Sequence, residues 1–353
     1  MVKGFLANLL INEGGSMFEY IYKLKNKMLE ADYDKAYIKL CEEYSTRLLQ
    51  NGLPVIFDRK HLALLLGLKE EYLKTLIVLS DGLYKKVRIP KSLGGYREID
   101  IPVEGLKYVQ RWILDNILYN IRISEVARGF VPKLSIKENA EKHVMKECLI
   151  TIDIKDFFPS IKFKTVYRIF SYFGYTNDMA YVFAKLCTRH ELLPQGAPTS
   201  PYISNIVCLK LDKRLLKLTQ SLNADYTRYA DDITISGNKN IEKYLDLFVK
   251  IINEEGFEIN TNKTRVKFRH DKQMVTGLVV NDKVSVPKKL KKYLSQQIYY
   301  CQKYGVSGHL KRINCDKSNY KEHLYGIAYF IKMIENEKGI KFLVGLNAIT
   351  WDY

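Results

Sequence analysis

The pattern of hydrophobic and polar positions predicts helices in the N-terminal part of the chain. Residues 17–50 are helical in character, and Asp58–Ile77 predicts two short helices that are broken at Gly67 and capped by Asp58. Two helices joined at a glycine also occur in helix-turn-helix motifs that read DNA grooves. Such pairs are far more often simple packing units, so groove reading is the secondary interpretation of this segment.

Short strands are predicted where the pattern changes to alternation and to short apolar runs. Tyr84–Pro102 predicts two strands around a Gly94-Gly95 turn, and Cys148–Ile154 predicts a buried strand. Thr227–Ser236 predicts a hairpin whose turn is acidic, and Met274–Val280 predicts a last strand. Helices are expected in the C-terminal region and over Lys164–Tyr172, Pro198–Leu218 and Ile241–Glu255.

The composition fits a globular protein of two or three subdomains around a continuous core. The chain has 353 residues, of which 47% are hydrophobic. No apolar run approaches the roughly 18 residues of a membrane span, and Gly4–Asn12 is too short for a secretory signal. Six cysteines without a CxxC pair indicate reduced thiols rather than disulfides or zinc ligands. A cytoplasmic protein is therefore expected.

The charge is strongly positive and concentrated in one region. The formal net charge is +17, which favours a polyanionic partner, either nucleic acid or an anionic membrane surface. Between Lys263 and Arg312 the sequence holds thirteen lysines and arginines against two acids. Tyrosines interleave with these bases, which favours contact with a nucleic-acid backbone over an ordinary solvated helix face.

Three aspartates give the strongest chemical signal. Asp153 ends the predicted buried strand, and Asp231 and Asp232 occupy the turn of the predicted hairpin. Nucleotide polymerisation is an in-line displacement that uses two divalent cations about 3.5–4 Å apart, held by hard oxygen ligands. A strand-end carboxylate that faces a pair of carboxylates in a neighbouring turn can hold both ions. Taken alone, two adjacent acids in a turn are also common as a solvated surface feature.

The order of three sequence boxes resembles that of reverse transcriptases. Asp153–Ser160 (DIKDFFPS), Leu193–Pro201 (LPQGAPTSP) and Tyr229–Asp232 (YADD) resemble motifs A, B and C of that family, and YADD matches its YxDD box. The QGAPTSP segment is of the kind shared by retron and group II intron enzymes. The resemblance extends from about Leu53 to the C terminus and leaves the first fifty residues without an assigned role.

This resemblance implies an α+β right-hand polymerase fold with fingers, a palm in which an antiparallel sheet packs on helices, and a helical thumb. The expected domains are an N-terminal helical extension over 1–52, fingers over 53–147, a palm over 148–285 and a thumb over 286–353. Within the palm range, residues 178–200 are expected to contribute to the fingers.

The resemblance also implies roles for residues of an active site. Asp153, Asp231 and Asp232 are the expected catalytic residues, and two Mg²⁺ ions are the expected cofactors, with Asp153, Ile154, Asp231 and Asp232 as their ligands. Phe158 falls at the steric gate, where an aromatic ring would collide with a ribose 2′-hydroxyl, and Lys263 matches a lysine that assists the departure of pyrophosphate. The expected contacts to the incoming nucleotide are Lys91, Arg97, Phe158, Gln195, Gly196 and Lys263. From the residues alone, the exposed bases are open to an unspecific role and Phe158 to an ordinary core role.

Two further elements resemble those of retron enzymes. Asn139–His143 resembles the NAxxH element and Val275–Gly277 the VTG triplet, which are associated with retron enzymes and their own structured RNA. Asn139 and His143 share one face if the segment is helical. The alternatives are a helix-surface or capping histidine and a strand with a glycine bulge. The expected RNA contacts are Asn139, Ala140, His143, Val275, Thr276, Gly277 and the thumb residues Lys288, Lys289, Lys291 and Lys292.

The resemblance therefore implies the RNA-directed DNA polymerase of a retron, which copies part of a cognate structured noncoding RNA into a short single-stranded DNA (msDNA). The expected partners are that RNA and its RNA–DNA product, dNTP substrates, a separate effector protein in an anti-phage defence system, and a host RNase H; no membrane is expected. Two alternatives stay open: a stand-alone defence or intron-like reverse transcriptase without retron RNA, and a non-catalytic RNA-binding scaffold that retains the fold.

Overall fold

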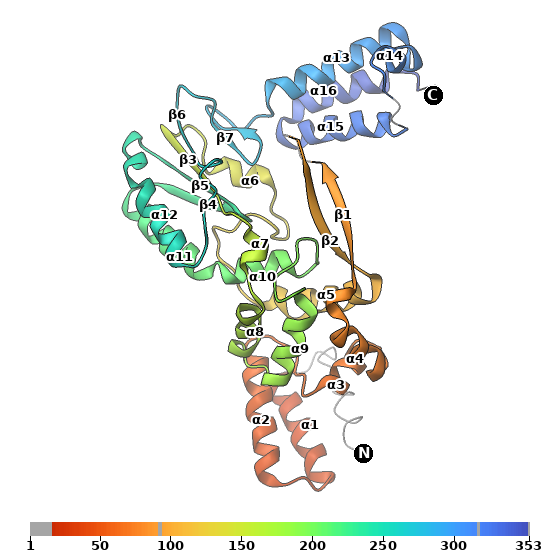
Figure 1. Cartoon of the computed structure of the whole chain (residues 1–353), viewed down its shortest axis with the longest axis vertical. Helices are drawn as coiled ribbons and strands as arrows, with labels where there is room; N and C mark the ends of the chain where they lie inside the picture. Colours follow the sequence, from red (N-terminus) through yellow and green to blue (C-terminus); the bar gives the residue numbers. More distant parts are fainter. Residues whose placement is uncertain (1–15, 91–93, 316–317, 352–353) are drawn as a thin grey trace. The chain divides into compact units, whose positions relative to one another are not determined.

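The computed structural model describes residues 16–90, 94–315 and 318–351, and the chain forms two compact units (Figure 1). The first unit consists of Met1–Val131, Ile154–Arg214 and Ile251–Glu258, and the second of Pro132–Asp153, Leu215–Lys250 and Ile259–Tyr353. Lys91, one of the predicted nucleotide contacts, lies outside the described residues. In the described ranges, no helix is both long enough and apolar enough to cross a membrane.

The first unit is mainly helical and contains one β-hairpin. Strands β1 (Tyr84–Pro90) and β2 (Tyr96–Pro102) pair in antiparallel register, as predicted. Helices α3 (Arg59–Leu65) and α4 (Glu70–Val78) confirm the predicted helix pair, and the Asp58 carboxylate caps α3 by accepting from the His61 backbone N–H at 2.8 Å. The other helices are α1 (Met17–Glu30), α2 (Lys35–Gln50), α5 (Glu104–Asn116), α7 (Phe157–Ser160), α8 (Phe163–Tyr172), α9 (Asn177–Cys187), α10 (Ser200–Val207), and the 3₁₀ turns η2 (Ser80–Gly82) and η3 (Leu118–Asn120).

Helix α2 is tied by side-chain hydrogen bonds to later parts of the first unit. The Tyr44 hydroxyl donates to the Ile56 carbonyl at 2.6 Å, and Arg47 Nη2 donates to the Gly174 carbonyl at 3.1 Å. Both acceptors are backbone groups outside α2, so these bonds fix the helix to the rest of the unit. The N-terminal helices therefore belong to the packing of the first unit.

A four-stranded antiparallel sheet with the strand order β4-β5-β3-β6 lies in the second unit. The predicted buried strand is β3 (Cys148–Asp153), and the predicted hairpin is formed by β4 (Asp225–Tyr229) and β5 (Asp232–Gly237). Strand β6 (Arg265–Phe268) pairs with β3 on the side opposite β5. Because β3 is central, its near-continuous apolar run is buried, with Ile150 fully enclosed and Ile152 1% exposed.

The C-terminal helices of the second unit share a hydrophobic core with α6 (Ile136–Glu141) and with a small hairpin of β7 (Met274–Val275) and β8 (Leu278–Val279). Ala140, Val275 and Leu278 are fully buried in this core. Helices α15 and α16 pack against each other (Figure 1). The C-terminal helices are α13 (Lys288–Tyr304), α14 (Val306–Arg312), α15 (Tyr320–Ile334) and α16 (Asn336–Asn347).

The single strand predicted over Met274–Val280 is wrong, because the chain reverses within it. Thr276 and Gly277 have φ values of 45° and 84° and connect β7 to β8 as the two central residues of a hairpin. Positive φ at both central positions is the property of a type I′ turn, in which glycine is favoured. Gly277 is therefore a turn residue, and the alternative of a strand with a glycine bulge is also wrong.

Two predicted helices are also divided. Pro198–Leu218 forms α10 and α11 (Leu209–Ser221), which meet at Cys208, and Ile241–Glu255 forms the 3₁₀ helix η4 (Lys239–Tyr244) followed by α12 (Leu245–Glu254). The apolar spacing continues across both breaks, so periodicity alone does not locate them. Helices together with antiparallel sheets confirm the predicted α+β class, whereas the predicted domain boundaries stay predictions.

Candidate active site

The pairing of β3 with β5 brings two of the three predicted catalytic acids face to face. Asp153, the last residue of β3, is opposite Asp232, the first residue of β5. Directly opposed residues of an antiparallel pair have Cβ atoms about 4.5–5.5 Å apart and point to the same face of the sheet. Asp153 is 8% exposed, while Asp232 is exposed. Two carboxylates therefore share one end of the sheet.

The third acid, Asp231, lies in the two-residue turn between β4 and β5. Tyr229 pairs with Asp232, so Ala230 and Asp231 are the central residues of this turn. Ala230 has a φ of 57°, whereas Asp231 has no positive φ, as in hairpin turns of type II′. Asp231 is therefore the turn residue directly before Asp232, which itself pairs with Asp153.

Arg228 supports this turn from inside the protein, a role that sequence reasoning missed. Its side chain is fully buried on β4, and Nη1 donates to the Ala230 carbonyl at 3.2 Å. A buried guanidinium is costly unless its donors are satisfied, so its presence here indicates a structural requirement. The available signal was a basic residue inside a strand whose neighbours, Tyr226 and Thr227, are buried.

Lys263 forms an ion pair with Asp153. Its Nζ atom lies 2.8 Å from Oδ2 and 3.0 Å from Oδ1 of that carboxylate. The hydrogen bond to Asp153 raises the pKa of Lys263, partial burial opposes this effect, and the charges of Asp231 and Asp232 raise the pKa further. The backbone N–H of Asn260 donates to the Asp153 carbonyl at 2.8 Å and anchors the loop that carries Lys263. Lys263 therefore lies beside Asp153, and its pKa also responds to the charges of Asp231 and Asp232.

The acids fit a divalent cation by their chemistry. Asp153, Asp231 and Asp232 supply hard carboxylate oxygens, and the ammonium group held against Asp153 shows that this end of the sheet attracts a cation. Among the residues that the structure describes, no three acidic, histidine or cysteine side chains are gathered tightly enough to form a ready-made metal site. The three carboxylates are thus suitable ligands for a divalent cation, and Lys263 occupies the one of Asp153.

Several predicted nucleotide contacts belong to the first unit. Arg97 is exposed on β2. Phe158 is half-buried on α7, with its ring centroid 5.4 Å from that of Phe157 and 6.4 Å from that of Phe130. The residue before this helix, Asp156, has a φ of 45°. The Phe158 ring therefore packs within an aromatic group and keeps part of its surface accessible.

Gln195 and Gly196 lie against β2 within the same unit. The Asp100 backbone N–H donates to the Gln195 carbonyl at 2.8 Å. Gly196 has a φ of 128°, and a Cβ atom there would lie 2.5 Å from Ile99 Cγ2 and 2.6 Å from the Asp100 carbonyl oxygen. Only glycine fits this backbone and this space. Strand β2 is therefore a close neighbour of the backbone at Gly196.

The predicted RNA contacts Asn139 and His143 have their side chains inside the second unit. His143 is fully buried, with Nδ1 2.7 Å from Ser236 Oγ and Nε2 2.8 Å from Thr227 Oγ1. Ser236 lies on β5 and Thr227 on β4, the two strands that lead into the acidic turn. His143 therefore links the segment after α6 to the hairpin that carries Asp231 and Asp232.

The two elements that resemble retron signatures meet each other. Asn139, 1% exposed on α6, donates through Nδ2 to Thr276 Oγ1 over a long 3.4 Å contact, and Thr276 Oγ1 donates to the Ile136 carbonyl at 3.4 Å. Ala140 and Val275 are buried in the same core. Gly277 is exposed and Thr276 half-buried at the tip of the turn. The turn tip is thus the accessible part of this pair of elements.

The predicted thumb lysines all lie in the first two turns of α13. Lys288, Lys289 and Lys292 are exposed, while Lys291 is partly buried and its Nζ lies 2.7 Å from Glu335 Oε1. The side chain of Glu335 is 8% exposed and also accepts from the Val286 backbone N–H at 3.0 Å. Glu335 therefore fixes the start of α13.

Comparison with known proteins defines the class of this protein. The family model for reverse transcriptase (RNA-dependent DNA polymerase) matches residues 89–305, which include the sheet and all three acids. The chain belongs to this family and is an RNA-directed DNA polymerase. The α+β arrangement and this membership confirm the predicted right-hand polymerase fold.

Individual relatives narrow the class to the retron type. The retron Ec86 reverse transcriptase of Escherichia coli is 32% identical over 322 residues, covering 90% of this chain and 97% of the relative. The retron Mx65 reverse transcriptase of Myxococcus xanthus is 34% identical over 275 residues, covering 72% of this chain and 62% of the relative. The chain is thus a retron-type bacterial reverse transcriptase. A solved telomerase of Candida tropicalis has a TM-score of 0.44 at 13% identity over 74% of this chain and 60% of that one, too distant to bear on function.

Proposed function

We propose that this protein copies part of a cognate structured RNA into a short single-stranded DNA, using the acids at the end of the β3–β5 pair for nucleotidyl transfer. The observation that carries the proposal is the register that sets Asp153 opposite Asp232, with Asp231 in the adjoining turn. Membership of the reverse transcriptase family indicates which reaction is catalysed. The paired carboxylates support the end of the β3–β5 pair as the place where it occurs.

In this proposal the three aspartates would hold two Mg²⁺ ions, with the Ile154 position as a further ligand. When bound, such ions would favour the 3′-hydroxyl as a nucleophile and stabilise the pyrophosphate leaving group. The 3′-oxygen forms a bond to the α-phosphorus while the bond to pyrophosphate breaks, and the hydroxyl proton leaves to solvent. Lys263, kept protonated beside Asp153, can donate a proton to the departing pyrophosphate.

The remaining nucleotide contacts are proposed on the first unit. Arg97 and Lys91 would contact the triphosphate, and Gln195 and Gly196 would lie beneath the nucleotide. Phe158 would exclude a ribose 2′-hydroxyl, and its partly accessible ring supports that role. An aromatic side chain can exclude one hydroxyl only if its own packing fixes the ring, and Phe157 and Phe130 provide such packing.

We propose different roles in RNA binding for the two elements that resemble retron signatures, Asn139–His143 and Val275–Gly277. The exposed tip at Thr276 and Gly277 would approach RNA, whereas Asn139, Ala140, His143 and Val275 would hold that tip and the catalytic hairpin from inside. The lysines of α13 would contact phosphates. A separate effector, a host RNase H and a role in anti-phage defence are further parts of the proposal that rest on the retron relation.

The direct experiment is to purify the full chain from its native host and sequence the nucleic acid that remains bound. The proposal predicts one RNA species joined to one short DNA. The Asp231→Asn/Asp232→Asn variant should retain the RNA and lack the DNA. Heterogeneous or protein-primed DNA would instead indicate a stand-alone enzyme, and DNA made by the double variant would contradict the assignment of the acids.

A further inference from the structure

A pocket rich in lysine opens in the second unit, and its lining includes neither the three acids nor Lys263. It has a volume of about 530 Å³, within the range of pockets that take small ligands. Its walls come from β8 and the segments on either side of the β7–β8 hairpin, from the start of α13 and from α16. We call it the lysine pocket, and the lysines that line it are Lys272, Lys283, Lys288, Lys289, Lys291 and Lys338.

The lysine pocket has far more positive than negative charge. Glu335 compensates Lys291 and Lys338 through contacts of 2.7 and 2.6 Å. Asp282 is the acid that lines the pocket, and Arg269 outside the lining already pairs with it at 3.2 Å. Across the described part of the chain, the other four lysines form no ion pair. Lys272, Lys283, Lys288 and Lys289 therefore leave a concentrated positive charge in a concave surface.

The start of helix α13 adds to the preference for an anion. Lys288 and Lys289 are its first two residues, no acid lies in its first turn, and Pro287 provides no side-chain cap. The N-terminus of a helix carries a partial positive charge that favours anions, so lysines there are unfavourable by themselves. A bound anion would offset both the lysines and the helix terminus.

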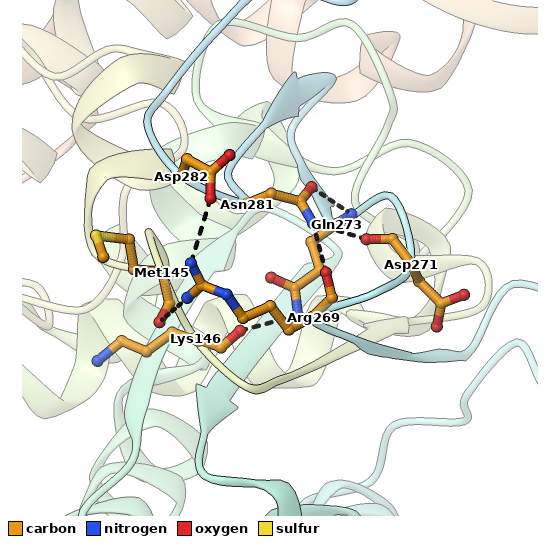
Figure 2. A network of polar contacts seen from close by, with 7 residues as sticks. All are labelled: Met145, Lys146, Arg269, Asp271, Gln273, Asn281 and Asp282. Atoms are coloured by element: carbon orange, nitrogen blue, oxygen red, sulfur yellow. Dashed lines mark hydrogen bonds and ion pairs between the residues drawn. The ribbon is translucent and has the colours of Figure 1, made fainter.

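The two segments that flank the β7–β8 hairpin are joined by a network of polar contacts (Figure 2). Asn281 Nδ2 donates to the carbonyls of Arg269 and Asp271 at 3.0 and 2.7 Å, and Asn281 Oδ1 accepts from the Gln273 backbone N–H at 3.0 Å. Arg269 in turn donates to the Met145 carbonyl at 3.2 Å. These bonds join the segment before β7 to the segment after β8, and Lys272 and Lys283 are exposed on these two connected segments.

We propose that the lysine pocket binds neighbouring phosphate groups of a structured RNA. This inference rests on the proposed function, which gives the protein an RNA partner. A lone small anion would be balanced by one or two lysines and would leave the others uncompensated, whereas successive phosphates present one charge at each step along the strand. The pocket thus adds Lys272 and Lys283 to the surface proposed to contact RNA, beyond the lysines expected on α13.

The test uses the full-length protein and a fluorescein-labelled RNA hairpin. Lys272→Gln/Lys283→Gln removes two pocket charges that make no ion pair among the described residues, so it should not disturb folding. The matched control is Lys243→Gln/Lys332→Gln, which removes two exposed charges elsewhere in the chain. Fluorescence anisotropy gives the affinity of each protein for the hairpin between 0.1 and 1 M salt. Extension of oligo(dT) on poly(rA), at saturating template, gives polymerase activity separately.

The pocket variant should lower the log–log salt slope by about 1.4–1.8, because each neutralised phosphate contributes about 0.7–0.9. Relative to equal affinity at 1 M salt, this corresponds to about 14- to 30-fold weaker binding at 0.15 M. Activity on poly(rA)/oligo(dT) should match that of the control variant.

A slope equal to that of the control would overturn the inference. Inorganic tripolyphosphate provides the second arm: if it binds wild type more tightly than the pocket variant while hairpin affinity is unchanged, the pocket takes a free anion, which also contradicts the RNA assignment. If wild type fails to extend oligo(dT), the proposed polymerase function fails, and the hairpin measurement still decides the role of the pocket.

Discussion

Lys263 Nζ lies 2.8 Å from Asp153 Oδ2, so an ammonium group occupies one of the carboxylates that we propose as metal ligands. The pair joins the loop after α12 to the end of β3. It also raises the pKa of Lys263, which keeps the lysine protonated at neutral pH. A divalent ion and the lysine should therefore compete for Asp153, and either one balances the charge of the acids.

This competition predicts how Lys263→Gln changes the metal dependence. The variant should reach half-maximal primer extension at about 2- to 5-fold lower Mg²⁺, the equivalent of losing a partly exposed ion pair worth about 0.5–1 kcal/mol. Its maximal rate should fall, because the proposed proton donor to pyrophosphate is absent. Titration of Mg²⁺ in extension assays measures both effects, with Lys267→Gln as the control. An unchanged or higher Mg²⁺ requirement contradicts the competition.

The buried position of His143 predicts a loss of stability when it is truncated. His143→Ala removes two hydrogen bonds and leaves a cavity, so the free energy of unfolding should fall by about 2–4 kcal/mol. His143→Gln, which can keep one of the two bonds, should lose less. Denaturant unfolding measures the change, and His270→Ala, on an exposed side chain, is the control.

The same variants separate an internal role of His143 from a direct contact with RNA. If His143 holds the catalytic hairpin, His143→Ala should also slow extension on poly(rA)/oligo(dT), a template that has no structured RNA. A loss of affinity for structured RNA with unchanged stability and unchanged extension would show that His143 contacts RNA directly.

The crowded backbone at Gly196 predicts that even one methyl group is harmful there. Gly196→Ala should destabilise the protein by about 1–3 kcal/mol, because alanine is strained at a φ of 128° and its Cβ meets the Asp100 carbonyl. Extension activity should fall together with the stability, because a shifted backbone at Gly196 also moves the adjacent Gln195, which we propose to lie beneath the nucleotide. Gly82→Ala, at a site with open space and ordinary φ, is the control. Equal stability of the two variants would show that β2 does not restrict Gly196.

The lowered pKa of Glu335 predicts that its contribution to the free energy of unfolding depends on pH. Burial favours its neutral form, but hydrogen bonds from Lys291, Lys338 and the Val286 N–H outweigh burial and lower its pKa below 4.5. Stability from such a carboxylate is present above the unfolded pKa of 4.5 and is lost as the pH falls through the lowered folded pKa. Glu335→Gln should therefore cost about 1–3 kcal/mol at pH 7 and much less in the acid range below pH 4.

Denaturant unfolding of wild type and Glu335→Gln at several pH values checks this dependence. Glu337→Gln, at an exposed acid in the first turn of α16, provides the comparison at each pH. A difference between wild type and Glu335→Gln that stays constant down to pH 3 would mean that the charge of Glu335 is not what holds α13.

The sequence predicted the elements whose hydrophobic pattern is strong. The apolar run of β3 and the alternation around Asp231 and Asp232 indicated a strand and a hairpin, and the motif order indicated that these acids work together. The register that puts Asp153 opposite Asp232 is a property of strand pairing, which no local pattern reports. The reversal at Thr276 was missed because a threonine with positive φ is uncommon.

Side-chain contacts between residues far apart in the chain are the second feature of the site that could not be predicted from the sequence. The NAxxH-like element was expected to present His143 to RNA, yet its partners Thr227 and Ser236 are more than eighty residues away in the chain. Arg228 was missed because a basic residue in a strand ordinarily indicates an exposed position. Both residues contact the hairpin that carries Asp231 and Asp232, and only the packing of the folded chain reveals that connection.

The most direct test of the catalytic assignment is Mg²⁺-dependent extension of oligo(dT) on poly(rA) by wild type and by Asp232→Asn. The variant keeps the shape of the side chain and removes the charge opposite Asp153. Asp246→Asn, an exposed acid on α12, is the control. The structure predicts that Asp232→Asn slows extension by about 10²-fold or more, while Asp246→Asn retains wild-type activity. Extension by Asp232→Asn at the wild-type rate would contradict the assignment of this end of the sheet as the active site.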